Sequence, residues 1–197
     1  MGATNKMPPL PAGYTQLEWF TTKGATNSFI DLLVTGKTTR RYEIDAQVVS
    51  NVSSVNTAIM SAVRNSKYFQ IVTNSSDSSF MFQAGSPNSA KPSTKDTNRH
   101  LFILDALHGR CRVDNNQWTS MDVGTEVTID LYCGLRNGDN ARASVVKFYS
   151  LKVYEDNLLI RHFVPCYEIE TGKNKLYDFV SGNAFDSNNN VDRGPEV

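Results

Sequence analysis

Strict alternation of apolar and polar residues constrains the fold of this chain more than any other feature. Residues 41–49 and 126–133 both alternate in this way. The apolar positions are Tyr42, Ile44, Ala46 and Val48 in the first segment, and Val127, Ile129, Leu131 and Cys133 in the second. Successive side chains of a strand point to opposite faces, so each segment would have one packed face and one wet face. This pattern is typical of an antiparallel sheet that packs on a second sheet.

Further segments also have the composition of strands. They are residues 28–34, 57–63, 68–73, 79–83, 100–106, 109–113, 144–154 and 158–164. Asn, Asp and Gly at 114–116, 137–140 and 155–157 favour tight hairpin turns between them. Residues 84–98 and 186–190 lack periodicity and are expected to be loops, and helical periodicity is hard to find. The sequence therefore predicts an all-β fold, a two-sheet antiparallel jelly-roll sandwich.

A length of 197 residues suits a single domain. We expect residues 10–197 to form it and residues 1–9 to be a flexible arm suited to docking on a neighbour. Twenty Lys and Arg balance twenty Asp and Glu, so no electrostatic feature points to nucleic acid or a membrane as partner. The first residues lack the apolar core of a secretory signal. We therefore expect the chain to stay in the cytoplasm or to leave by another route, such as inside an assembling virus particle.

The two ends of the chain carry strings that are found together in one family. The opening strings are Leu10-Pro11-x-Gly13-Tyr14-x-x-Leu17-Glu18-Trp19 and Phe29-Ile30-Asp31. The closing strings are Val153-Tyr154, Phe163-Val164-Pro165-Cys166, Leu176-Tyr177-Asp178, Phe185 and Gly194-Pro195-Glu196-Val197. In these strings the chain resembles the laminin-G-like, concanavalin A-like β-sandwich family of gut-phage structural proteins and gut-bacterial surface proteins. The middle of the chain matches only in strand rhythm.

The resemblance implies a fold in which the first and last strands pair, with Tyr14, Trp19, Phe163 and Tyr177 as buried anchors. Members of the family serve unrelated roles, usually without an assigned activity. The resemblance favours a non-enzymatic structural protein of a bacteriophage virion, such as a head-decoration, fibre or tail-associated component. Its partners would be other virion proteins, with self-association as an option. The alternative is a carbohydrate-binding adhesin module on a phage or on a bacterial cell surface.

Residues 43–47 invite comparison with an enzyme. Laminarinase-type glucanases share the jelly-roll fold and carry a Glu-x-Asp-x-(x)-Glu strand, in which the outer glutamates are nucleophile and acid/base. Glu43 and Asp45 match its beginning, but Gln47, or Val48 across a bulge, stands where the second glutamate belongs. Retaining hydrolysis needs two carboxyl groups about 5–5.5 Å apart, and an amide cannot replace one of them. A glycoside hydrolase is therefore disfavoured, and no catalytic residue is assigned.

Two clusters are candidates for contact with a glycan or a partner protein. Sugar-binding sites typically place an aromatic ring beside polar groups, and Trp118 near Asn115 and Asn116 comes closest to that arrangement. Arg64 and Tyr68 form a second and weaker cluster. The competing interpretation is that Trp118 covers the edge of its own hairpin.

Metals and cofactors find little support in the sequence. His100, His108 and His162 are not spaced as a set of metal ligands. Residues 186–192 superficially resemble a calcium loop but lack its glycine and its closing glutamate. We therefore expect no cofactor, with Ca²⁺ as a remote alternative. The three cysteines include no C-x-x-C pair and are expected to be free thiols.

Overall fold

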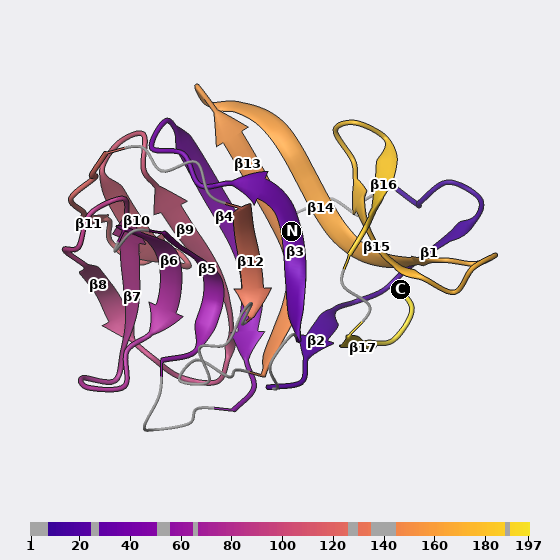
Figure 1. The fold of residues 1–197 in the computed structure, drawn as a ribbon, viewed down its shortest axis with the longest axis horizontal. Helices are drawn as coiled ribbons and strands as arrows, with labels where there is room; N and C mark the ends of the chain where they lie inside the picture. Colours follow the sequence, from indigo (N-terminus) through magenta and orange to yellow (C-terminus); the bar gives the residue numbers. More distant parts are fainter. Residues whose placement is uncertain are drawn as a thin grey trace, which may run out of the picture.

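Two antiparallel β-sheets packed face to face make up the protein (Figure 1). The computed structural model describes residues 8–24, 28–50, 56–64, 67–125, 130–134, 145–187 and 190–197. Within these ranges eleven strands form a large sheet, six form a small sheet, and no helix occurs. The all-β, two-sheet antiparallel sandwich predicted from the sequence is therefore confirmed. The predicted arm at residues 1–9 lies almost wholly outside the described residues.

The large sheet has eight strands in sequence across its width and three more at one side. Its order is β11 (Thr119–Ser120), β10 (Arg110–Val113), β9 (Arg99–Asp105), β4 (Arg40–Val48), β13 (Val146–Glu155), β14 (Leu158–Glu168), β15 (Asn174–Asp178) and β16 (Asn183–Asp186). The three additional strands are β1 (Tyr14–Gln16), which pairs with β14, and β2 (Phe20–Thr22), which pairs with β13 and with β17 (Val191–Arg193).

The small sheet covers one face of the large sheet. Its order is β3 (Phe29–Thr35), β12 (Asp130–Gly134), β5 (Ala58–Arg64), β6 (Lys67–Thr73), β7 (Ser79–Ala84) and β8 (Ala90–Thr94). The predicted loop at 84–98 is wrong in part, because β8 lies within it. β8 pairs only with β7 and so is an edge strand, where Pro and Lys are tolerated.

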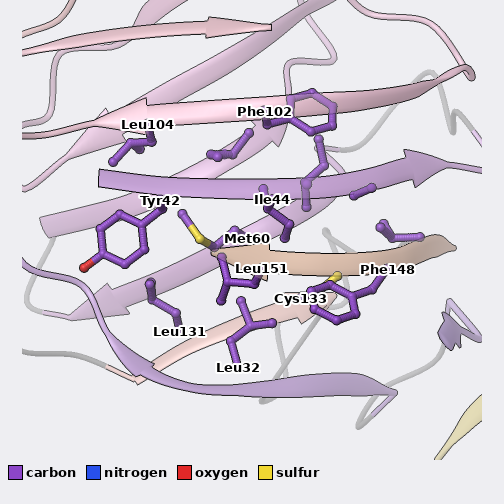
Figure 2. Packing of buried hydrophobic residues seen from close by; sticks show 14 of the residues in the cluster. Leu32, Tyr42, Ile44, Met60, Phe102, Leu104, Leu131, Cys133, Phe148 and Leu151 are labelled. Carbon is purple, nitrogen blue, oxygen red and sulfur yellow. The ribbon is translucent and has the colours of Figure 1, made fainter. Parts of the chain in front are cut away.

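The core lies between the sheets, as Figure 2 shows. Strand β4 alternates as predicted: Tyr42, Ile44, Ala46 and Val48 are at most 1% exposed, and the residues between them are half-buried. Burying one such large apolar side chain stabilises the fold by about 1.5–3 kcal/mol. The hydrophobic contacts of β4 thus account for its place at the centre of the large sheet.

The hydroxyl of Tyr42 satisfies its hydrogen bonds at the end of this core. It donates to the carbonyl of Thr35 at 2.7 Å and accepts from the amide of Lys37 at 2.8 Å. Burial raises the pKa of this phenol. Because Thr35 is the last residue of β3 and Lys37 follows it, Tyr42 ties the large sheet to the end of this strand of the small sheet.

Two of the three predicted hairpins are confirmed. The turn at 114–116 joins β10 to β11, and Asp156 and Asn157 join β13 to β14 with positive φ angles of 49° and 66°. Asn and Asp adopt this left-handed conformation more readily than most residues. The turn predicted at 137–140, and the start of the strand predicted at 126–133, lie outside the described residues.

The two ends of the chain pair with each other and with the same strands. Tyr14 is opposite Glu168, Val191 is opposite Thr22, and an isolated bridge joins Leu17 to Glu196. Figure 1 shows these strands gathered at one side of the large sheet, where the C-terminus lies. The pairing of first and last strands that was expected from the end strings is thus present.

The expected anchors are only partly buried. Phe163 and Tyr177 are 1% and 7% exposed, but Tyr14 and Trp19 are half-buried. Tyr14 packs in a small second cluster with Val164 and Tyr177, apart from the main core. Trp19 lies under the side chain of Lys147 and not between the sheets. The expectation of four buried anchors is therefore corrected to two, Phe163 in the main core and Tyr177 in the second cluster.

Candidate functional site

Trp118 is positioned by the hairpin of β10 and β11. Cys111 and Val113 of β10 point into the core, so Arg110 and Arg112 point outward. Their guanidinium carbons lie over the indole of Trp118 at 4.2 and 4.4 Å from a ring centroid. The indole is half-buried and lies across the outer face of its own hairpin. It is therefore not a bare platform for stacking on a sugar.

The polar residues predicted near Trp118 form the tip of the turn. Asn115 and Asn116 are exposed, and the amide of Asn116 donates to the carbonyl of Val113 at 3.2 Å. Asp114 has a positive φ of 52° and accepts the amide of Leu101 at 2.8 Å. The two asparagines remain accessible to a ligand or partner.

The second predicted cluster belongs to the other sheet. Arg64 ends β5 and is opposite Lys67 of β6, and Tyr68 is opposite Val63. Tyr68 is half-buried, whereas the side chain of Arg64 lies outside the described part. Strand pairing does not bring this cluster next to Trp118, so the two are separate candidates.

A third group, on the outer face of the large sheet, was not predicted. Three rings each carry a cation on their face: Trp19 with Lys147, Tyr149 with Arg99, and Tyr154 with Arg41. The cation-to-centroid distances are 4.0, 3.7 and 4.0 Å, and the rings of Trp19 and Tyr149 are 5.8 Å apart. We call these six residues the aromatic–cation face. Such contacts contribute about 0.5–1 kcal/mol each at exposed sites.

Hydrogen bonds fix three of the six residues of this face, Arg99, Tyr149 and Tyr154. Arg99 donates from Nε and Nη2 to the two carboxylate oxygens of Asp45 at 2.8 and 2.7 Å. The hydroxyl of Tyr154 donates to Glu43 at 3.2 Å. Burial raises the pKa of both Tyr149 and Tyr154, so both phenols stay neutral near pH 7. This part of the face is thus held in place before anything binds.

The same contacts bear on the glucanase comparison. Glu43 and Asp45 project from the outer side of β4. Gln47, on the same side, occupies the position at which a glucanase has its second glutamate. The amide of Gln47 donates to the carbonyl of Thr97 at 2.9 Å, and its oxygen accepts from Tyr149 at 3.1 Å. The nitrogen and the oxygen of the Gln47 side chain are therefore both hydrogen-bonded to neighbouring residues.

His100 bridges two carboxylates, which the sequence did not predict. Its Nδ1 lies 2.6 Å from Asp114 and its Nε2 lies 2.8 Å from Asp96. Burial lowers the pKa of His100, but the two hydrogen-bonded carboxylates outweigh burial and raise the pKa above its usual value. Asp96 and Asp114 are four and fourteen residues away from His100 in sequence, so no local sequence pattern predicts these contacts.

Within the described ranges, no group of three or more His, Cys, Asp or Glu side chains could hold a metal ion. In the segment compared with a calcium loop, Asp186 pairs with Lys175 at 2.8 Å and Asp192 with Lys23 at 3.2 Å. Residues 188–189 of this segment lie outside the described part.

The three cysteines are free, as predicted, and all three are buried. Burial raises the pKa of Cys111 and Cys166 to about 12, and that of Cys133 is raised as well. The thiolate is the reactive form, so these side chains are unreactive in the folded protein.

Comparisons of this chain with family models, with curated proteins and with solved structures found no match. No helix in the described residues is long and apolar enough to cross a membrane. The fold and the surface together define the class as an all-β sandwich whose large sheet presents an ordered set of aromatic and cationic side chains.

Proposed function

We propose that the protein is a non-enzymatic structural component of a phage virion, as a head-decoration, fibre or tail-associated protein. It binds other particle proteins through a sandwich of jelly-roll, concanavalin A-like topology. The aromatic–cation face carries this proposal. Trp, Tyr and Arg are the residues that contribute most at protein interfaces, and five of the six residues of this face are of these types.

Preorganisation supports binding of a partner protein by this face. Side chains that are already hydrogen-bonded lose little freedom on association, so more of the contact energy is retained. The bidentate pair of Arg99 with Asp45 and the pair of Arg41 with Glu43 also leave little net charge between the rings. A partner therefore meets aromatic surface beside two arginines that are already paired and one lysine, Lys147, over the ring of Trp19.

Mass spectrometry of gradient-purified phage particles tests the virion assignment. Peptide abundance, scaled to the major capsid protein, should give a fixed and substantial copy number for this chain. Absence from particles would remove the virion proposal.

A matched pair of variants tests the aromatic–cation face. Tyr154→Ala should lower the copy number in particles, because it removes a ring from the face. Tyr167→Ala is the control, because Tyr167 makes a similar contact with Arg193, at 4.7 Å, outside the aromatic–cation face. The melting temperature of both variants shows whether each remains folded. Equal incorporation of both would assign the docking surface to another part of the molecule.

The second candidate is a carbohydrate-binding adhesin on a phage or on a bacterial cell surface. It is favoured by the exposed Asn115 and Asn116 at the turn that leads to Trp118. A glycan array tests it with the native protein and with Asn115→Ala/Asn116→Ala. Selective binding that this double variant abolishes would favour the adhesin.

A further inference from the structure

A cavity of about 430 Å³ opens between the two sheets at the end of the sandwich. One side is formed by β3 and β12 of the small sheet, and the other by residues of β4, β13 and β14 of the large sheet. Leu33, Val34 and Ile160 supply its apolar walls. Sites for small molecules are typically concave, with volumes of about 300–1,000 Å³ and a few placed polar groups.

The backbone of β3 is irregular where it lines this cavity. Thr35 is opposite Asp130 and Asp31 is opposite Tyr132, so the residues between them do not pair one to one. Leu33 lies within this irregularity with a positive φ of 56°, which is rare for a bulky side chain and costs about 1–3 kcal/mol. Its side chain is 37% exposed. The strand thus presents an apolar side chain at the cavity from a strained backbone.

Two of the four charged residues at the cavity neutralise each other. Nη2 of Arg40 donates to Glu155 at 3.0 Å, and Nη1 of Arg40 lies 3.4 Å from the carbonyl of Thr35. Lys37 adds a second cation 3.7 Å from Glu155. Together these three side chains form a polar wall, in which the two cations share a single carboxylate.

The other two charged residues at the cavity, Asp130 and Arg161, do not pair with each other or with Arg40 and Glu155. The carboxylate of Asp130 is exposed and has no hydrogen-bond or ion-pair partner among the described residues. Arg161 donates from Nη1 to the carbonyl of Ile160 at 2.9 Å and forms an ion pair with the buried Asp178 at 3.7 Å, while its side chain stays partly exposed at the cavity. Asp130 comes from the small sheet and Arg161 from the large sheet. The cavity therefore offers one anion and one cation, on opposite walls, beside an apolar surface.

We propose that this cavity binds a small zwitterion with an apolar body, such as an apolar amino acid or dipeptide. The guanidinium of Arg161 binds the carboxylate and Asp130 binds the ammonium group, as charge-assisted hydrogen bonds. The apolar body lies against Leu33, Val34 and Ile160. The site does not depend on the proposed virion function, and its test uses the isolated protein.

Titration of the full chain with leucyl-leucine, followed by ¹H–¹⁵N NMR, tests the site. The amide signals of Leu33, Thr35, Asp130 and Arg161 should shift, with a dissociation constant on the order of 1 mM. The control ligand is acetyl-leucyl-leucine amide, which keeps the apolar body and removes both charges. It should bind at least about tenfold more weakly.

Two substitutions assign the ends of the ligand. Arg161→Gln and Asp130→Asn should each weaken leucyl-leucine binding about tenfold, while Lys173→Gln, at an exposed position that does not line the cavity, should leave it unchanged. Unshifted amide spectra confirm that each variant is folded. No change of the four signals at about ten times the expected dissociation constant would overturn the proposal. Equal binding of the uncharged control would overturn it too.

Discussion

His100 lies between two carboxylates at the start of β9, and its protonation contributes to stability. Its pKa is raised in the folded state, so this contribution is fully present below the unfolded value of about 6.5. It is lost as the pH rises through the higher folded value. We expect His100→Gln to cost about 1–3 kcal/mol at low pH and less at high pH. Urea unfolding of both proteins at about pH 5.5 and about pH 8.5 measures the difference.

His162 provides a control of opposite sign. Burial, and then the charge of Lys152, lower the pKa of His162, so the folded state resists its protonation. The native protein therefore loses stability from this residue as the pH falls through about 6.5. His162→Gln should remove that loss. If both histidine variants changed the pH dependence in the same direction, the role assigned to His100 would be wrong.

Trp118 covers its hairpin from outside, so its removal should be tolerated. Trp118→Ala loses the contacts with Arg110 and Arg112, which we expect to cost about 1–2 kcal/mol, or roughly 2–8 °C in melting temperature. Phe102 on the neighbouring strand is fully buried, and Phe102→Ala should cost about 3–5 kcal/mol. Thermal unfolding compares the two variants. Equal losses would place the indole in the core.

Among the elements, the closing strands depend on one close approach. The backbone of Gly194 lies against the indole of Trp19, and its amide donates to the carbonyl of Trp19 at 2.9 Å. A Cβ on Gly194 would be 2.6 Å from Cδ2 of Trp19, so the ring would have to move. We expect Gly194→Ala to cost about 1–3 kcal/mol by denaturant unfolding.

Val197→Ala is the control for this closure. Its side chain is 77% exposed, so the substitution should change stability by no more than about 0.5 kcal/mol. The amide of Val197 donates to Gln16 at 3.2 Å and is unaffected by the substitution. A neutral Gly194→Ala would show that the indole moves freely and that its position does not matter for the closure.

Elements differed in how far the sequence could predict them. Strand β4 is central and buried on one face, so strict alternation marks it. Strand β8 is an edge strand with Pro92 and exposed Lys91, and its composition resembles that of a loop. The short strands β1, β2 and β17 pair across almost the whole chain, and only the end strings pointed to them. Local sequence patterns predict strands that are buried on one face. They do not predict strands that form only because a distant segment of the chain pairs with them.

The candidate sites were less predictable for a related reason. The tip of the turn before Trp118 could be read from three consecutive residues. The aromatic–cation face combines residues from β4, β9 and β13 with Trp19, so its members are neighbours only after the sheet has formed. The irregularity between Phe148 and Ser150 also breaks the alternation that would have placed Tyr149.

For the whole molecule, the interleaved ends imply a single cooperative unit. β2 lies between β13 and β17, and β1 pairs with β14, so neither end can leave without exposing the other. We expect one unfolding transition, with equal calorimetric and van't Hoff enthalpies of roughly 140 kcal/mol near 60 °C. Differential scanning calorimetry measures both enthalpies.

The three buried thiols allow the cooperativity of unfolding to be measured at three separate places in the fold. Cys111 and Cys133 belong to the main core, in the large and small sheets, whereas Cys166 belongs to the second cluster. Because burial suppresses their thiolates, each should react with a thiol reagent only when its surroundings open. Mass spectrometry after pulsed labelling across a urea series should give one midpoint for all three. A lower midpoint for Cys166 alone would mean that β14 to β16 open as a unit before the rest of the sandwich unfolds. The paired chain ends would then stabilise this side of the large sheet without coupling its unfolding to that of the main core.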